Sequence, residues 1–144
     1  MRINITGSLT SLSNKLLNIQ KATQNAEFIE DLAPLIASSI VQRVQKRGLG
    51  LDGKPMKQYS PKYKERRLKG GRNVSYRDLT YSGKMFQSLT SQKRGSEVVI
   101  FFGSMAEKKK AYVNDQRTEF FGIGSEEKDI IDRETARYFK YMIG

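Results

Sequence analysis

The chain has 144 residues, 26 of them basic and 15 acidic, a net charge of +11, and neither cysteine nor histidine. That length suits one compact domain with one core. The two missing residue types exclude disulfides, Cys–His and Ser–His–Asp catalytic systems and the usual zinc sites. We therefore expect one domain over residues 1–144, with no enzymatic activity, no catalytic residue, no cofactor and no metal.

The first 24 residues predict an extension made of a strand and a helix. Residues 2–6 alternate apolar and polar side chains as a short strand does. Four apolar side chains then recur at helical spacing: Leu9, Leu12, Leu16 and Ile19. This N-terminus lacks the apolar core of a signal peptide, and no apolar run approaches the ~18 residues that span a bilayer. We therefore expect synthesis in the cytoplasm and no membrane partner.

A long amphipathic helix is predicted next, because apolar residues recur at every third or fourth position. It is expected to end near Arg47, with Gly48 as the residue that closes its C-terminus. Pro34 leaves two alternatives: the helix kinks there, or a new helix begins with Asp31 as its cap. The stripe expected to face the core is Phe28, Leu32, either Leu35 or Ile36, Ile40 and Val44.

Residues 48–81 are predicted to form a long basic loop region that contains one short helix. Three glycines and a proline between residues 48 and 59 are typical of turns. Ser60 and Pro61 are a favourable N-cap and first residue for a helix that extends to about Lys69. Two glycines end it, and residues 70–78 are expected to be mobile.

The rest of the chain predicts alternating helices and a hairpin. Residues 82–89 suit a short helix that buries Met85, Phe86 and Leu89. A Gly-Ser pair separates two β-prone segments, residues 89–94 and 97–102. Residues 108–114 predict one or two helical turns. A final helix is expected to begin with Ser125 as its cap and to bury Ile131, Thr135, Tyr138 and Met142. Together these elements predict a single-domain α+β fold.

The charge is concentrated in one part of the chain. Residues 43–77, which we call the basic stretch, hold twelve basic and two acidic residues, so the other 109 residues carry a net charge of only +1. Such a local surplus could contact an acidic protein surface, bind phosphates with tyrosines stacking on bases, or serve solubility alone. The candidate docking residues are Lys54, Lys57, Tyr59, Lys62, Tyr63, Arg66, Arg67, Lys69, Arg72 and Arg77.

Two further motifs suggest chemistry that their context does not support. Residues 48–53 match the G-x-G-x-x-G pattern, but a dinucleotide site needs that pattern between a strand and a helix, whereas here it follows a helix. The acidic residues of the final helix suggest a metal or hydrolase site that would depend on Asp129 and Asp132; they are Glu126, Glu127, Asp129, Asp132 and Glu134. Basic partners three or four residues away favour a solvated, salt-bridged face instead; the expected pairs are Lys128–Asp132, Asp129–Arg133 and Glu134–Arg137.

Four segments, in order, resemble the phage virion-morphogenesis family, whose members are tail-completion or neck proteins. Residues 51–63, LDGKPMKQYSPKY, are similar to the family's D-G-x-P-W … L-S-x-x-Y loop, with Met56 in place of the aromatic residue. Residues 79–89, LTYSGKMFQSL, resemble its L-x-x-S/T-G-x-L-x-x-S-L helix. Residues 111–116, AYVNDQ, are similar to its Y-A-x-x-H/N-x segment. Residues 117–125, RTEFFGIGS, resemble its R-x-F-L-G-x-S segment.

The resemblance implies a non-enzymatic structural protein of a tailed-phage virion, made in the host cytoplasm. It implies a homo-oligomeric ring, sixfold or twelvefold, at the junction of head and tail. The implied neighbours are head-completion or adaptor proteins and tail-terminator or tail-tube proteins, with non-specific contact to DNA in the channel. A small basic nucleic-acid-binding protein remains the alternative.

Overall fold

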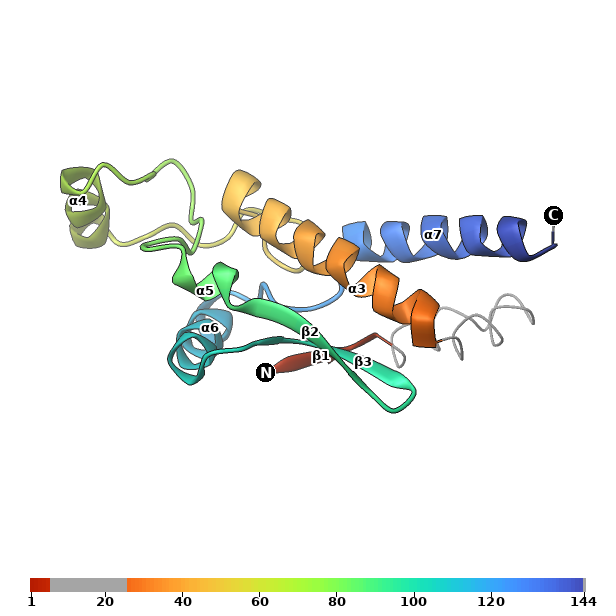
Figure 1. The fold of residues 1–144 in the computed structure, drawn as a ribbon. Helices are drawn as coiled ribbons and strands as arrows, with labels where there is room; N and C mark the ends of the chain where they lie inside the picture. The colour runs from red at the N-terminus through yellow and green to blue at the C-terminus, as the bar shows by residue number, and fades with distance from the viewer. Residues whose placement is uncertain (6–25, 144) are drawn as a thin grey trace.

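The computed structural model describes residues 1–5 and 26–143 and has the predicted α+β architecture (Figure 1). Three antiparallel strands form one sheet in the order β1-β3-β2. They are β1 (Arg2–Asn4), β2 (Leu89–Arg94) and β3 (Glu97–Phe102). The strand predicted at residues 2–6 is therefore present but shorter, and the helix predicted between Leu9 and Ile19 lies outside the described residues.

The hairpin predicted from the Gly-Ser pair is confirmed. Arg94 pairs with Glu97, so the loop contains only Gly95 and Ser96. Gly95 has a φ of +63°, a value that tight hairpin turns require and that glycine adopts without strain. The N-terminal strand β1 pairs with the other edge of β3, with Ile3 opposite Ile100. Segments almost one hundred residues apart therefore share the sheet.

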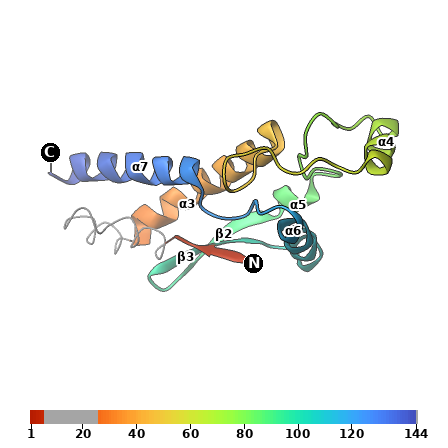
Figure 2. The same ribbon diagram turned by 180° about the vertical axis from the view of Figure 1, so that it is seen from behind.

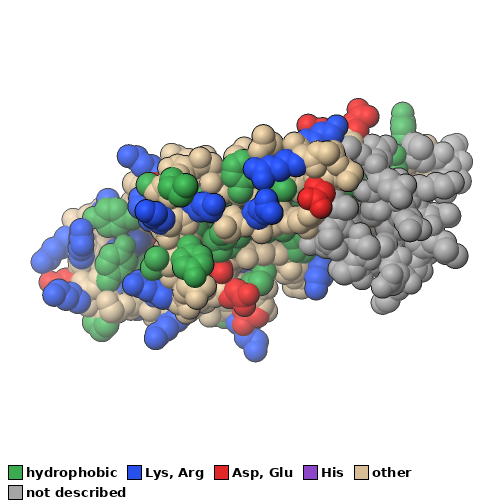
Figure 3. All heavy atoms as spheres, turned by 90° about the horizontal axis from the view of Figure 1, so that it is seen from below, with side chains coloured by type: hydrophobic (Ala, Val, Ile, Leu, Met, Phe, Trp, Pro, Cys, Tyr) green, Lys and Arg blue, Asp and Glu red, His purple; other side chains and the backbone are tan. Residues whose placement is uncertain are grey.

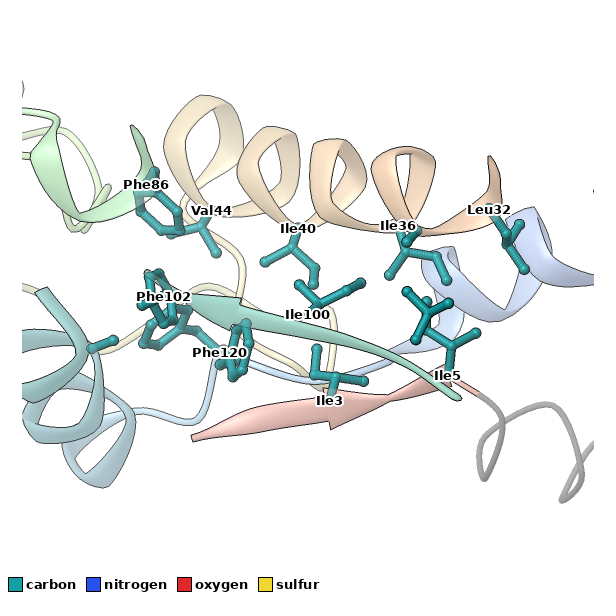
Figure 4. Close-up of a cluster of buried hydrophobic side chains, with 14 of the residues drawn as sticks. Ile3, Ile5, Leu32, Ile36, Ile40, Val44, Phe86, Ile100, Phe102 and Phe120 are labelled. Carbon is teal, nitrogen blue, oxygen red and sulfur yellow. The ribbon is translucent and has the colours of Figure 1, made fainter. Parts of the chain in front are cut away.

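The long helix α3 (Ala26–Val41) lies over this sheet and supplies most of the core (Figure 4). Leu32, Ile36, Ile40 and Val44 are buried, as the helical spacing predicts. Of the two alternatives for the third position, Ile36 is correct, because the Leu35 side chain is 44% exposed. Figure 4 shows these side chains facing Ile3, Ile5, Ile100, Phe102 and Phe120 across the layer between helix and sheet.

The helix continues through Pro34, which settles the alternative that the sequence left open. Pro34 lies inside α3, so no new helix begins with Asp31 as its cap. The last turns form a π-helix, η2 (Gln42–Lys46), and Arg47 is its C-cap. Gly48 then has a φ of +64° and donates its N–H to the Val44 carbonyl at 2.9 Å. The predicted end of the helix is confirmed.

The C-terminal helix α7 (Ser125–Ile143) packs against α3. Ile131 and Thr135 are buried and Tyr138 is half-buried, whereas the side chain of Met142 lies outside the described residues. The prediction that Ser125 caps α7 is wrong, since Ser125 is its first residue. Oε2 of Glu127 instead accepts the N–H of Gly124 at 2.9 Å, which satisfies one of the free donors at the start of the helix.

Glu127 also forms the central ion pair of the fold, which corrects its assignment to a solvated face. Its Oε1 accepts hydrogen bonds from Arg43 Nε at 3.3 Å and from the Ser39 hydroxyl at 2.8 Å. Arg43 donates further to the carbonyls of Leu49 and Phe120. Both charged side chains are almost completely buried. This network joins α3, the loop after η2, the loop before α7, and α7 itself.

The other carboxylates of α7 agree only in part with the predicted pattern. The Glu134–Arg137 pair is present at 3.1 Å, and Glu134 also pairs with Arg133. Neither of the other two expected pairs, Lys128–Asp132 and Asp129–Arg133, is an ion pair within residues 1–5 and 26–143. Glu126 pairs with Arg47, which lowers the pKa of that glutamate chiefly through the hydrogen bond.

Two short helices complete the body of the molecule. The helix α5 (Lys84–Gln87) buries Met85 and Phe86, but Leu89 belongs to strand β2 rather than to this helix. The helix α6 (Met105–Arg117) is longer than the one or two turns predicted at residues 108–114. Within the part of the chain that the structure describes, no helix is long and apolar enough to cross a membrane.

Candidate functional site

Residues 57–83, which we call the arm, extend away from the sheet at the end opposite the C-terminal end of α7 (Figures 1 and 2). The arm holds the predicted short helix, α4 (Pro61–Lys69). Ser60 is its N-cap and accepts the N–H of Tyr63 at 3.3 Å, and Pro61 is the first residue, as predicted. Most of the basic stretch therefore lies on a projection rather than on the core.

The arm is fixed by a buried network around Arg67 and Asp78. Nη2 of Arg67 donates to the Asp78 carboxylate at 2.8 Å, and its Nε donates to the carbonyl of Asn73 at 2.8 Å. The Asn73 amide bonds back to the Tyr76 carbonyl and to Asp78. Residues 70–78, predicted to be mobile, have defined hydrogen-bond partners in the structure.

Tyr59 lies at the centre of this network. Its hydroxyl donates to the Asp78 carboxylate at 3.1 Å and accepts the N–H of Leu79 at 3.0 Å. Burial, followed by the nearby Asp78 charge, raises the pKa of Tyr59 to about 12. The guanidinium groups of Arg67 and Arg77 lie 4.6 and 5.1 Å from the centre of its ring. Tyr59 therefore organises the arm and is not a free surface side chain.

The ten predicted docking residues divide by exposure into three groups. The exposed group is Lys54, Lys57, Lys62, Arg66 and Lys69; Tyr63 and Arg72 are half-buried; Tyr59, Arg67 and Arg77 are buried. Arg72 places its guanidinium 3.8 Å from the centre of the Tyr81 ring and donates to the Tyr81 carbonyl. The expectation that all ten form an outer docking surface is therefore corrected for the three buried side chains.

A groove of about 880 Å³ lies between the arm and the helices α5 and α6. The arm contributes Tyr59, Arg67 and Arg77, and α6 contributes Lys110 and Arg117. Tyrosine rings, Leu79 and Met85 supply the apolar part of the lining. Figure 3 shows basic side chains, interspersed with apolar ones, gathered over this end of the molecule. The groove is therefore concave, basic and partly aromatic.

Two arginines of the groove keep polar atoms without a hydrogen bond. Arg67 Nη1 and Arg77 Nε and Nη1 are buried and have no hydrogen-bond partner among the described residues. Nη2 of Arg77 makes only a long contact, 3.4 Å, to the Gln58 carbonyl. Burial lowers the pKa of the Arg77 guanidinium, and Arg117 lowers it further. Buried polar groups are normally satisfied, so these unpaired donors mark an unusual site.

The backbone of the groove is also strained at one position. Leu79 has a φ of +53°, and it is the only non-glycine residue with a positive φ in the described ranges. The left-handed conformation costs a residue with a Cβ about 1 kcal/mol or more, and it persists where surrounding contacts impose it. Here the Tyr59 hydroxyl accepts the Leu79 N–H and holds that backbone in place.

The two motifs that the sequence disfavoured as sites are structural. The glycines of residues 48–53 close η2 and form a tight turn, in which Leu49 bridges Pro55 and Gly53 donates to the Gly50 carbonyl. No helix begins at that turn, as a dinucleotide site requires. Over residues 1–5 and 26–143, no three side chains of the metal-binding types cluster closely enough to hold an ion.

No pattern in the sequence predicted that α6 contributes to the groove. Lys110, Asn114 and Arg117 lie at least 33 positions beyond Arg77 and outside the basic stretch. They reach the arm because the hairpin turns the chain back before α6 begins. Comparison with known proteins adds no further residue: scans of family models, curated proteins and solved structures find no match to this chain.

Proposed function

We propose that this chain is a non-enzymatic structural subunit of a tailed-phage virion, which forms a homo-oligomeric ring at the head–tail junction. The proposal rests on the resemblance of residues 51–63, 79–89 and 111–125 to the virion-morphogenesis family. In the structure these segments contact one another, since the Leu51 N–H donates to the Glu119 carbonyl and α5 packs against α6. They are therefore one region of the molecule rather than scattered matches.

The observation that carries the proposal is the opposite charge of two distant surfaces. The arm holds eight basic and two acidic residues. The helix α3 has three carboxylates in its first turns, Glu27, Glu30 and Asp31, and no basic residue. The N-terminal end of α3 and the arm lie at opposite ends of the molecule (Figure 1).

A closed ring needs a heterologous interface, in which two different surfaces of each subunit meet. A basic arm on one copy and an acidic helix end on the next copy would supply charge complementarity, which sets orientation and the rate of encounter. Exposed apolar side chains would add buried area; Leu68 on the arm and Met105 and Tyr112 on α6 are of this kind. The implied partners are further copies and the adjoining head-completion and tail-terminator or tail-tube proteins.

A genetic experiment tests this function. Phage particles made without the protein should accumulate as filled heads and finished tails that are not joined, and supplying the wild-type chain should restore joining. A variant with Lys62 and Arg66 changed to glutamate should restore it poorly, because the arm loses its positive charge. Joined, infectious particles in the complete absence of the protein would refute the proposal.

A small nucleic-acid-binding protein is the second candidate, favoured by exposed cations on the arm. Lys57, Lys62 and Arg66 have no carboxylate partner among the described residues. Binding to duplex or single-stranded DNA should then weaken steeply with salt, because each phosphate contact releases a counterion. Absence of any shift of either DNA at low salt would remove this candidate.

A further inference from the structure

The groove between the arm and α6 has a surplus of positive charge that the protein does not neutralise. It is lined by six basic side chains and by one carboxylate, Glu107. Glu107 pairs with Lys110, and Asp78 pairs with Arg67. Four cations of the lining remain without a carboxylate partner within the described ranges: Lys57, Arg66, Arg77 and Arg117.

Arg77 is the informative member of this set, because it is buried as well as unpaired. Its side chain is only 7% exposed, and two of its three nitrogens have no hydrogen-bond partner in the part of the chain described here. A guanidinium stays charged, and a buried charge is costly unless it is paired and hydrogen-bonded. Arg67, 1% exposed, adds another unsatisfied nitrogen in the same groove.

We infer that the groove is a binding site for a phosphate group, held by Arg77 and Arg117 with Arg67 completing the hydrogen bonds. Arginine donors match phosphate oxygens in number and geometry, and such charge-assisted hydrogen bonds are roughly twice as strong as neutral ones. Four unneutralised cations suit a phosphate of charge near −2 better than a single carboxylate. This inference goes beyond the proposed ring and does not depend on it.

The shape of the groove limits which kinds of phosphate-bearing ligand can bind in it. Arg77 lines a concave groove and is only 7% exposed, so a small phosphate group reaches it more readily than the convex backbone of a duplex does. A free phosphate compound or a phosphate of a single strand can enter. The strained backbone of Leu79, fixed by Tyr59 beside the groove, is consistent with a site whose shape is set in advance.

Binding to the full-length protein tests the inference. Titration calorimetry at fixed ionic strength should detect the binding of inorganic phosphate and of adenosine monophosphate, whereas chloride at the same ionic strength should give no heat of binding. Arg77→Met should weaken binding about tenfold to a hundredfold, because it removes charge-assisted hydrogen bonds. Lys54→Met removes the same charge outside the groove and should leave the Kd within about twofold.

Further variants and ligands separate a loss of phosphate binding from a loss of folding, and a nucleic-acid ligand from a free compound. Arg77→Met should not lower the melting temperature of the free protein, because a buried unpaired charge is replaced by an apolar side chain. Should that variant fail to fold, Arg117→Gln, at an exposed position, provides the same test with a weaker effect. A 5′-phosphorylated single strand distinguishes a nucleic-acid source from a free compound. No phosphate binding by the wild type, or binding unchanged in both arginine variants, would overturn the inference.

Discussion

Replacing Glu127 by glutamine should be among the most destabilising conservative changes in this chain. The side chain is completely buried, and its two oxygens accept three hydrogen bonds, from Ser39, Arg43 and Gly124. Glutamine fills the same space, but its NH₂ group must face at least one of these donors. The substitution also leaves the buried Arg43 guanidinium without a counterion.

The burial and the partners of Glu127 determine how much free energy of unfolding the substitution removes. An unsatisfied buried donor costs about 1–3 kcal/mol, and removing one partner of a buried ion pair costs about 3–5 kcal/mol in all. We therefore expect Glu127→Gln to lower the free energy of unfolding by about 3–5 kcal/mol. Domains of this size commonly have only about 5–15 kcal/mol, so the loss is a large part of the total.

Urea unfolding, followed by circular dichroism, measures this difference. Glu126→Gln is the matched control, because it is the same chemical change in the adjacent residue, whose partner Arg47 is largely exposed. Exposed pairs contribute about 0–1 kcal/mol, so the control should unfold almost as the wild type does. Equal effects of the two substitutions, or a loss below about 1 kcal/mol for Glu127→Gln, would refute the assignment of Glu127 to the centre of the fold.

Three further predictions follow from the packing and the titration of single residues. Gly48→Ala should cost about 1–3 kcal/mol, because the new Cβ would lie 2.7 Å from a tyrosine Cβ at a φ of +64°; Gly53→Ala, equally left-handed but in open space, should cost less. Ile36→Ala should cost about 2–5 kcal/mol and Leu35→Ala far less, since only the first leaves a cavity. Both pairs are measured by urea unfolding. Because the folded pKa of Tyr59 is about 12, above its ordinary value of 10, its protonated form stabilises the fold fully below pH 10, and that stability is lost as pH rises toward 12. The advantage of wild type over Tyr59→Phe in free energy of unfolding should therefore shrink above pH 10, and a constant difference would contradict this.

Periodicity and local turn chemistry predicted the body of the fold well. The spacing of Ile36, Ile40 and Val44 predicted the buried face of α3 and η2, and Gly48 marked the end of η2, because both depend on neighbours within one or two turns. The hairpin followed for the same reason. The pairing of β1 with β3 depends on contacts between residues almost one hundred positions apart, which periodicity does not encode.

The candidate site was predictable in position but not in arrangement. Eight of the twelve basic residues of the basic stretch lie on the arm. The density of Lys and Arg could not separate exposed Lys62 from buried Arg67 and Arg77, since burial of an arginine is decided by a distant carboxylate or by the closing wall of a groove. Asp78 lies one residue beyond the basic stretch, and Arg117 forty residues beyond Arg77. Only the fold brings them to the same place.

The central proposal is that the chain forms a ring at the head–tail junction, and electron cryo-microscopy of virions assembled with this chain tests it most directly. The account predicts that the map contains the α3–sheet–α7 body repeated around the axis between the head connector and the tail, with the arm of each copy against the next copy or the adjoining layer. A complete junction map in which no density fits this fold, from particles that join normally, would contradict it.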